Sequence, residues 1–314
     1  MESSHPAGYV ADGVPDEATV VIPAEPSSTP TALAESPQPS PTAMPTGTAT
    51  ATPTPQPSPT AEPSPTPTAT PEPIPLPTPD GVARTLRMPV LMYHYISEPP
   101  PGAGSVRRDL SVPPERFASH LRALRDQGYT TISLHDLTLA LQIGHPLPEK
   151  PIVITFDDGY RDNYENAFPI LQEYGYTGTF FLITSVIDEG HPDYMSWDQV
   201  IEMAAAGMEM QAHGKTHDDL RGRSVEHLVW QMLGPKESIE AHTGTPVRFF
   251  CYPSGRYDAE AIQVLHSAHY WGAATTRAGV DQRSDRMFEL PRIRVRGDYD
   301  ATRLLAVISS FMQE

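Results

Sequence analysis

Short apolar segments alternate with amphipathic segments along most of this 314-residue chain, and this alternation limits the folds available to it. Strands are expected at 88–96, 129–133, 152–156, 179–183, 208–212, 249–252 and 271–275. Helices are expected at 113–128, 135–143, 167–173, 197–206, 225–243 and 259–268. Repeated strand–helix units of this kind predict an α/β fold, either a parallel (β/α) barrel or a doubly wound sheet.

Residues 1–80 have a composition that does not support a hydrophobic core. They hold 21 of the 36 prolines and nine of the 39 acidic residues, but no Lys or Arg. Such a segment buries too little apolar surface to offset the entropy of ordering, and its prolines favour an extended chain. We therefore predict a disordered Pro/Thr/Ser-rich spacer over 1–80, followed by a single α/β domain over 82–314.

Charge and cysteine content limit the partners and the location of the chain. The formal net charge is −17 and the sequence has no basic cluster, which argues against a nucleic-acid partner and suits a neutral or amide-bearing substrate. The single cysteine, Cys251, is expected to be a small buried thiol. No export signal is visible, yet spacers of this composition often hold an enzyme away from a membrane or cell wall. We therefore expect an extracytoplasmic or cell-surface location.

Polar residues follow several of the expected strands, at the ends where parallel α/β folds place their chemistry. Asp157 and Asp158 come directly after the strand at 152–156, His213 follows a later strand, and His94 lies at the end of the first. Two buried carboxylates side by side would repel each other unless a cation or hydrogen-bond donors compensated them. A metal ion bound by one carboxylate would explain the pair. A solvated Asp-Asp-Gly turn explains this segment equally well.

His213 and His217 form a His-x-x-x-His pair. Their spacing lets both imidazole rings reach one ion, either from a helical turn or from a loop that leaves a strand. Two histidines and one carboxylate suit zinc, iron, cobalt or manganese and leave positions open for water and substrate. The pair alone is weak support for a metal site, because such spacing also occurs by chance. Its place after a strand, like that of the paired aspartates, strengthens the prediction.

Three motifs together, Thr155-Phe-Asp-Asp-Gly159, His213-x-x-x-His217 and Tyr252-Pro-Ser-Gly255, resemble those of the polysaccharide deacetylases of carbohydrate esterase family 4, the NodB homology domain. The resemblance spans residues 88–298. It implies a deformed barrel of mainly parallel strands and a metal-dependent hydrolase that removes acetyl groups from an N-acetylated sugar, with a metal-bound water as nucleophile.

The same resemblance implies a role for each of four residues. Asp157 matches the catalytic base, while Asp158, His213 and His217 match the ligands of a divalent metal ion. We expect zinc as the cofactor, with cobalt, manganese or nickel as alternatives. The implied partner is an acetylated polysaccharide; poly-N-acetylglucosamine, peptidoglycan, chitin oligomers and acetylated xylan all fit the motifs.

The sequence departs from the family's usual pattern in two places. Cys251 and Ser254 stand where the third motif has an arginine and a tyrosine, and no histidine follows His269 to supply the usual C-terminal acid. The segment 89–96 resembles the rearranged branch that deacetylates poly-N-acetylglucosamine, in which the acid comes from the first strand. That resemblance implies that His94 is the acid. A core or rim histidine bonded to the backbone is the alternative.

The segment Leu290-Pro-Arg-Ile-Arg-Val295 also resembles this branch. Either Arg292 or Arg294 could replace the missing arginine and hold the Asp157 carboxylate through two hydrogen bonds. A surface strand is an equal alternative for this segment.

By analogy with the third motif, the backbone N–H of Ser254 would stabilise the oxyanion, because Pro253 has no N–H to donate. In the implied reaction Asp157 accepts a proton from the attacking water and His94 gives one to the leaving amine.

Other interpretations fit part of the sequence. The aromatic residues Tyr93, Tyr160, Trp197 and Tyr252 are candidates for sugar stacking, although packing is the commoner role of such side chains. A non-catalytic glycan-binding domain and a deacetylase of O-acetylated xylan are alternative functions. A glycosidase is disfavoured, because adjacent carboxylates seldom reach the separation of about 5 Å or more that glycoside hydrolysis requires.

Overall fold

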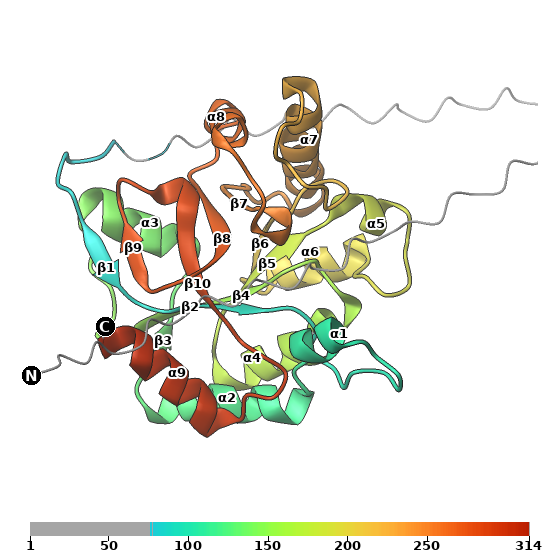
Figure 1. The fold of residues 1–314 in the computed structure, drawn as a ribbon, viewed down its shortest axis with the longest axis vertical. Coiled ribbons are helices and arrows are strands. Elements are labelled where there is room, and N and C mark those ends of the chain that lie inside the picture. Colours follow the sequence, from blue (N-terminus) through green and yellow to red (C-terminus); the bar gives the residue numbers. More distant parts are fainter. Residues whose placement is uncertain (1–75, 77, 314) are drawn as a thin grey trace, which may run out of the picture. The chain divides into compact units, whose positions relative to one another are not determined.

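The computed structural model describes residues 76 and 78–313, and its centre is a closed barrel of seven parallel strands (Figure 1). In spatial order the ring runs β2, β10, β8, β7, β6, β5 and β4, and β4 pairs with β2 to close it. The bounds of these strands are β2 (Val90–Tyr93), β4 (Pro151–Phe156), β5 (Thr179–Leu182), β6 (Glu209–Ala212), β7 (Phe249–Cys251), β8 (Gly272–Ala278) and β10 (Leu290–Arg294). The spacer predicted over 1–80 lies outside the described residues except at its last positions.

Pairing between β2 and β4 distinguishes this barrel from an open doubly wound sheet. Val90 to Tyr93 pair in parallel register with Val153 to Phe156. Every residue of β2 is buried, as is every residue of β5 and β7, because helices cover the outer face of the ring. The predicted barrel of mainly parallel strands is therefore confirmed.

Helices surround the ring, with α2 and α9 side by side on one flank and α7 beside α8 on another (Figure 1). Their bounds are α1 (Ser105–Leu110), α2 (Pro114–Asp126), α3 (Leu134–Ile143), α4 (Phe168–Tyr174), α5 (Thr184–Asp188), α6 (Trp197–Ala205), α7 (Val225–Thr243), α8 (Ala259–Ser267) and α9 (Ala301–Gln313). Local sequence sets several of these ends. Ser133 begins α3 through a capping box with Asp136, and Gly144 ends that helix in the left-handed conformation.

Several elements differ from the sequence-based expectations. The sequence suggests one strand over 88–96, but β2 ends at Tyr93. The short helices α1 and α5 and the C-terminal helix α9 are additional, as is an antiparallel pair outside the ring, β1 (Thr85–Arg87) with β9 (Asp281–Arg283). The short strand β3 (Thr130–Thr131) pairs with β4 outside the barrel. The sequence does contain a helical pattern for α9, because Leu304 and Ile308, which are buried on one face, are four residues apart.

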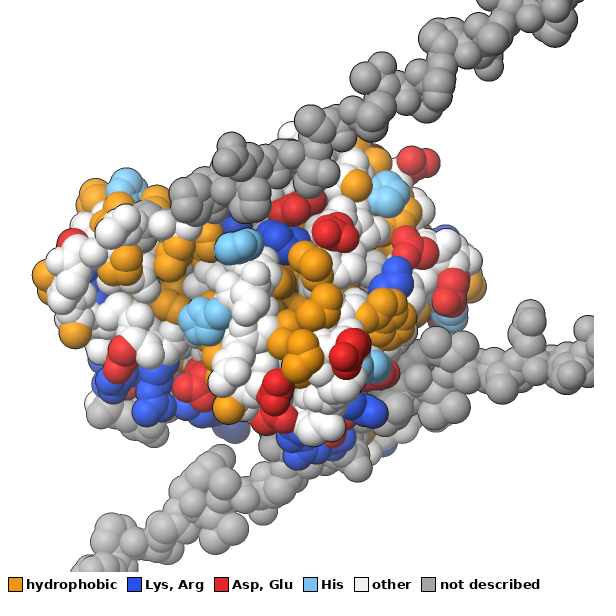
Figure 2. Space-filling model, turned by 90° about the horizontal axis from the view of Figure 1, so that it is seen from above, with side chains coloured by type: hydrophobic (Ala, Val, Ile, Leu, Met, Phe, Trp, Pro, Cys, Tyr) orange, Lys and Arg blue, Asp and Glu red, His pale blue; other side chains and the backbone are white. Residues whose placement is uncertain are grey.

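The described surface carries charges of both signs. On the face shown in Figure 2, basic side chains lie among acidic ones rather than forming one continuous basic area. Ion pairs such as Arg221 with Asp219, at 2.6 Å, and Lys215 with Asp188, at 2.9 Å, contribute to this mixture. Among the helices that the structure describes, none is both long and apolar enough to cross a membrane.

The folded body includes residues at the end of the predicted spacer. The N–H of Asp80 donates to the carbonyl of Gln142 at the end of α3, at 3.1 Å. The Asp80 carboxylate also accepts hydrogen bonds from the Arg84 guanidinium, at 2.5 and 2.8 Å. We therefore propose that the domain begins near Thr78, slightly earlier than the boundary at 82 that composition suggests.

A chain shortened to begin at Thr78 should keep the Tm of the full-length protein, because it retains the contacts of Asp80. Differential scanning calorimetry of both chains tests this expectation. A clearly lower Tm for the shortened chain, or resistance of residues 1–75 to proteases in the full-length protein, would contradict the assignment of this segment as a spacer.

Candidate active site

The candidate site lies at the carboxyl ends of the barrel strands. Asp157 and Asp158 follow β4, His213 follows β6, Ser254 lies in a short 3₁₀ turn after β7, and His94 follows β2. Parallel strands bring these positions to one end of the barrel, although they are far apart in sequence. Most of these side chains also contact one another.

Three side chains converge on one point and form the metal-ligand group: Asp158, His213 and His217. The Asp158 Oδ1 atom lies 3.3 Å from His213 Nε2 and 3.4 Å from His217 Nε2. Asp158 adopts a left-handed backbone conformation, with φ of 75°, directly after the extended strand. Because of this sharp turn, the two adjacent carboxylates point to different partners. The repulsion expected between them from the sequence is therefore compensated.

The geometry and chemistry of this group fit a divalent metal ion. Donor atoms bound tetrahedrally to zinc at about 2.0–2.1 Å lie about 3.3–3.4 Å apart, which matches the two separations at Asp158. The Nδ1–H of His213 is engaged by the carbonyl of Cys251 at 2.8 Å, so its Nε2 lone pair is the one available to a metal. All three donors lie within 4.8 Å of one another. The residues present therefore suit the ion that the sequence predicts.

The histidine pair comes from a loop and not from a helical turn. Residues 213–217 leave β6 without regular secondary structure, and Gly214 and His217 have φ values of 87° and 58°. The sequence left both possibilities open. The loop arrangement means that the spacing alone does not direct the two rings to one ion, so contacts from other elements must do so.

The second carboxylate, that of Asp157, is held by a buried arginine. Arg292 Nη1 donates to Asp157 Oδ1 and Arg292 Nη2 donates to Oδ2, both at 2.7 Å. Arg292 has no exposed surface, and its other N–H groups donate to the Thr275 carbonyl, the Thr155 hydroxyl and the Cys251 sulfur. Of the two arginines considered from the sequence, the structure therefore brings Arg292 to Asp157. Arg294 instead lies beside Asp109, with Nε 3.9 Å from its Oδ2.

These neighbours keep both carboxylates ionised despite burial. Burial alone would raise the pKa of Asp157, but the Arg292 guanidinium holds that pKa below its usual value. Burial opposes ionisation of Asp158 too, and the His213 and His217 rings hold its pKa below the usual range. Thr155 was not recognised as part of the site from the sequence. Its position in the Thr155-Phe-Asp-Asp motif, two residues before Asp157, was the available signal.

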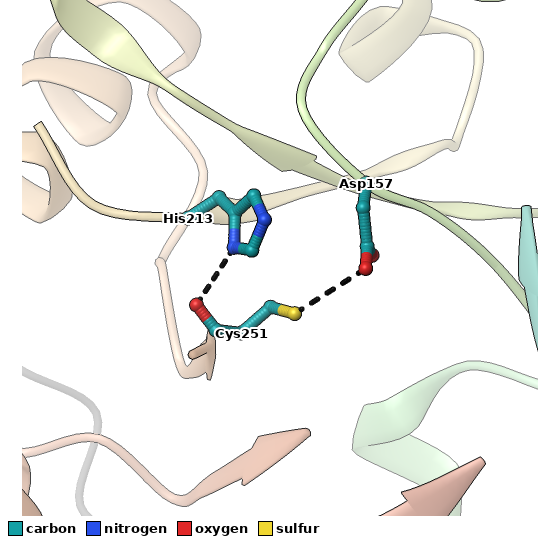
Figure 3. A group of neighbouring side chains, drawn as sticks. All are labelled: Asp157, His213 and Cys251. Carbon is teal, nitrogen blue, oxygen red and sulfur yellow. Dashed lines mark hydrogen bonds between the residues drawn. The ribbon is translucent and has the colours of Figure 1, made fainter. Parts of the chain in front are cut away.

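Cys251 contacts both His213, through its carbonyl, and Asp157, through its thiol (Figure 3). Its thiol lies 3.6 Å from Asp157 Oδ2 and 3.1 Å from Arg292 Nη2, and it has no exposed surface, as predicted. Burial raises the pKa of this thiol. Asp157, His213 and Cys251 form a second group of potential metal ligands. The Arg292 guanidinium already supplies the positive charge beside this group, and the Cys251 carbonyl engages His213 Nδ1, so the Asp158 group fits the predicted ion better.

The remaining two predicted residues lie beside these groups. His94 is buried, and its Nε2 lies 4.0 Å from Asp157 Oδ2. The side chain of Asn163 donates to the His94 carbonyl at 2.8 Å and so fixes the backbone at that position. Ser254 has a φ of 53° in its turn, where the N–H groups of Gly255 and Arg256 are used internally.

The aromatic residues considered for sugar stacking have packing partners. Tyr93 and Tyr252 are completely buried, so a stacking role for them is wrong. The Tyr160 ring stacks on Tyr95 with centroids 3.6 Å apart. One face of Trp197 is covered by the parallel ring of His242 at 3.8 Å. Tyr93 and Tyr252 are therefore packing residues. In Tyr160 and Trp197 one face of the ring is already covered by a neighbouring ring.

Comparison with known proteins identifies relatives of this chain. A family model described as polysaccharide deacetylase matches residues 144–273. The Bacillus subtilis (strain 168) protein YxkH, whose name assigns it provisionally to the polysaccharide deacetylases, is 32% identical over 224 residues, which cover 71% of this chain and 77% of that protein. The poly-beta-1,6-N-acetyl-D-glucosamine N-deacetylase of Staphylococcus aureus (strain MSSA476) is 30% identical over 206 residues, covering 61% and 70%.

Solved structures agree with these sequence relatives. Streptococcus pyogenes deacetylase PplD, solved in complex with acetate, superposes with a TM-score of 0.66 and 28% identity, covering 72% of this chain and 99% of that one. IcaB from Ammonifex degensii gives a TM-score of 0.60 and 25% identity, covering 70% and 96%.

The barrel, its strand-end site and these similarities together define the chain as a hydrolase. It belongs to the polysaccharide deacetylase family, whose members typically depend on a metal ion. The resemblance drawn from the three motifs is therefore confirmed. The similarity to relatives named as poly-N-acetylglucosamine deacetylases also agrees with the branch inferred from the segment 89–96.

Proposed function

We propose that this protein is a metal-dependent deacetylase that removes N-acetyl groups from a polysaccharide containing N-acetylglucosamine. The observation that carries the proposal is the pair of adjacent carboxylates with separate partners. Asp158 converges with His213 and His217 on one metal-sized position, while Asp157 is held ionised by Arg292 within the same buried site. A glycan-binding domain without catalysis would need no second, arginine-held carboxylate beside a metal position.

In this proposal each residue has a separate task in amide hydrolysis. Asp158, His213 and His217 would hold a divalent ion, which would supply Lewis acidity to the acetamide and to a water molecule. Asp157 is the general base that takes the proton of the attacking water, because its carboxylate stays ionised beside Arg292. The Ser254 N–H donates to the developing oxyanion. His94 protonates the nitrogen that leaves, so the products are acetate and a free amine.

The choice of substrate class rests on the relatives. The Staphylococcus aureus relative is named for deacetylation of poly-beta-1,6-N-acetyl-D-glucosamine, and the chain covers 70% of it. We therefore favour an N-acetylated glucosamine polymer over O-acetylated xylan. Zinc is the proposed ion, since two imidazoles and one carboxylate at tetrahedral separations suit it. We also propose an extracytoplasmic or cell-surface location, supported by the proline-rich composition of residues 1–80.

Acetate release from β-1,6-linked N-acetylglucosamine oligomers tests the proposed function. The wild-type protein should release acetate, a chelator should abolish the release, and added Zn²⁺ or Co²⁺ should restore it. Mass spectrometry of a panel that includes chitin oligomers, peptidoglycan fragments and acetylated xylan identifies the preferred substrate. Binding to oligomers without release of acetate would favour the glycan-binding alternative, and release from xylan alone would favour the esterase.

Replacing His213 with alanine should lower bound-metal stoichiometry and acetate release together, because the change removes one of three protein ligands. Inductively coupled plasma mass spectrometry of the purified protein measures the metal. The matched control is His145→Ala, which removes an exposed histidine from the loop after α3. Wild-type metal content in His213→Ala would show that this residue is not a ligand.

A further inference from the structure

The loop that carries both histidines of the metal-ligand group depends on contacts from outside itself. Gly214, Lys215 and Thr216 separate the two ligands, and no helix or strand hydrogen bonds fix their backbone. His217 has a φ of 58°, a conformation that a residue with a side chain adopts only at a cost. The orientation of the two imidazole rings must therefore be stabilised by neighbouring elements.

A single buried side chain on α7, Gln231, pairs with three polar groups of this loop. Its Oε1 accepts hydrogen bonds from the N–H of Lys215 at 2.8 Å and from the N–H of Thr216 at 3.2 Å. Its Nε2 donates to the Thr216 hydroxyl at 2.5 Å. Gln231 has no exposed surface, and Lys215 and Thr216 are half-buried, so loss of the amide would leave three polar groups of the loop without this partner.

The loop is shaped to admit this amide. A Cβ atom at Gly214 would lie only 3.1 Å from Gln231 Oε1, and the glycine has a φ of 87°. From the other side, the N–H groups of Thr184 and Ser185 at the start of α5 donate to the carbonyls of Gly214 and Lys215. The α5 backbone thus holds the carbonyls of the loop, while Gln231 holds its N–H groups.

We propose that Gln231 is a positioning residue for metal binding. It fixes the path of the chain between His213 and His217, so that both Nε2 atoms meet Asp158 at a single ion without a large ordering cost when the metal binds. The inference rests on the proposed function only in requiring that the Asp158 group binds a metal. Gln231 contacts none of the reacting atoms, so its effect must appear in metal affinity.

The test measures the Kd of the apoprotein for Zn²⁺ by competition with a chromophoric chelator, together with the absorption spectrum of the Co²⁺ form. Gln231→Leu should weaken metal binding by about 10- to 100-fold and alter the Co²⁺ spectrum, as loss of groups that orient metal ligands typically does. Gln231→Glu should restore most of the affinity, because a carboxylate accepts both N–H groups and the Thr216 hydroxyl can turn to donate.

The matched control is Gln282→Leu. Gln282 is equally buried, and its Nε2 donates to the carbonyls of Met88 and Pro291 at 3.4 and 3.1 Å. Its loss should lower stability while leaving the Zn²⁺ Kd unchanged. If Gln231→Leu does not fold, Thr216→Val removes one of the three hydrogen bonds from a half-buried position and should weaken binding in the same direction.

Three results would count against the proposal in different ways. A wild-type Kd in the folded Gln231→Leu protein, or in Thr216→Val where that variant is needed, would overturn it. So would an equal loss of affinity in Gln282→Leu, which would indicate a general effect of destabilisation. Failure of the wild-type apoprotein to bind any divalent ion would instead refute the metal-dependent function itself.

Discussion

Replacing Arg292 with methionine should destabilise the protein by about 3–5 kcal/mol, the usual cost of removing one partner from a buried ion pair. The guanidinium donates two hydrogen bonds to Asp157 and has no exposed surface, so no water replaces it readily. Denaturant unfolding at neutral pH measures the loss. Turnover should also fall steeply, because Asp157 would no longer be held ionised as a base.

A double variant separates this pair from general damage to the core. Asp157→Asn combined with Arg292→Met removes both charges, and it should be more stable than Arg292→Met alone because no buried carboxylate is left uncompensated. Arg292→Lys keeps the positive charge but not the planar fork of donors, so its stability should lie between those of Arg292→Met and the double variant. If the double variant is as unstable as Arg292→Met, the cost comes from packing around the guanidinium and not from the ion pair.

The Asp157–Arg292 pair predicts opposite pH dependences of stability for the wild type and for Arg292→Met. In the wild type the pKa of Asp157 is held below its unfolded value of about 3.9, so its contribution to stability is present above that pH and is lost as pH falls through the folded pKa. In Arg292→Met the main group that opposes burial is gone, so the pKa of Asp157 rises relative to the wild type. Stability of the variant should therefore increase relative to wild type as pH is lowered, and the acidic limb of its pH–rate profile should move to higher pH.

The sequence predicted the class of fold well because the strands are buried on both faces and stand between strong helix signals. Ile152–Phe156 is almost purely apolar, and Ser133 and Gly144 bracket α3. Closure of the ring was harder to predict from the sequence, since it depends on β2 pairing with β4 across about sixty residues of chain. Periodicity carries no information about such a contact. The motif resemblance, and not the pattern of elements, distinguished the barrel from an open sheet.

Part of the site could also be predicted from the sequence, because the order of the strands determines where it lies. Residues directly after strands, such as Asp157 and His213, could be placed at one end of the barrel from topology alone. The partners that set their chemistry lie elsewhere in sequence. Arg292 and Arg294 were indistinguishable by spacing, because residues two apart on a strand are expected on the same face, and only packing assigns one to Asp157. Gln231 gave no sequence signal, since a glutamine on a helix is normally exposed.

We propose that relocated groups, and not a loss of function, account for the two departures from the family pattern. The thiol of Cys251 is small enough to leave room for a guanidinium from β10, and Arg292 Nη2 lies 3.1 Å from its sulfur. The role of the third-motif arginine is thus compatible with a side chain from another strand. The same reasoning applies to the acid, because β2 closes the ring beside β4 and brings His94 to within 4.0 Å of Asp157.

Replacing His94 with alanine should therefore reduce turnover by about 10²- to 10⁴-fold, the usual contribution of a general acid, while metal content stays at the wild-type level. His94 is not a member of the metal-ligand group, so the two readouts should separate, in contrast to His213→Ala. His94→Gln provides the control for packing, since it keeps a polar side chain at the buried position but cannot act as an acid, and it should be as inactive as the alanine variant. Near-normal turnover of either variant on an amide substrate would assign the proton donor to another group.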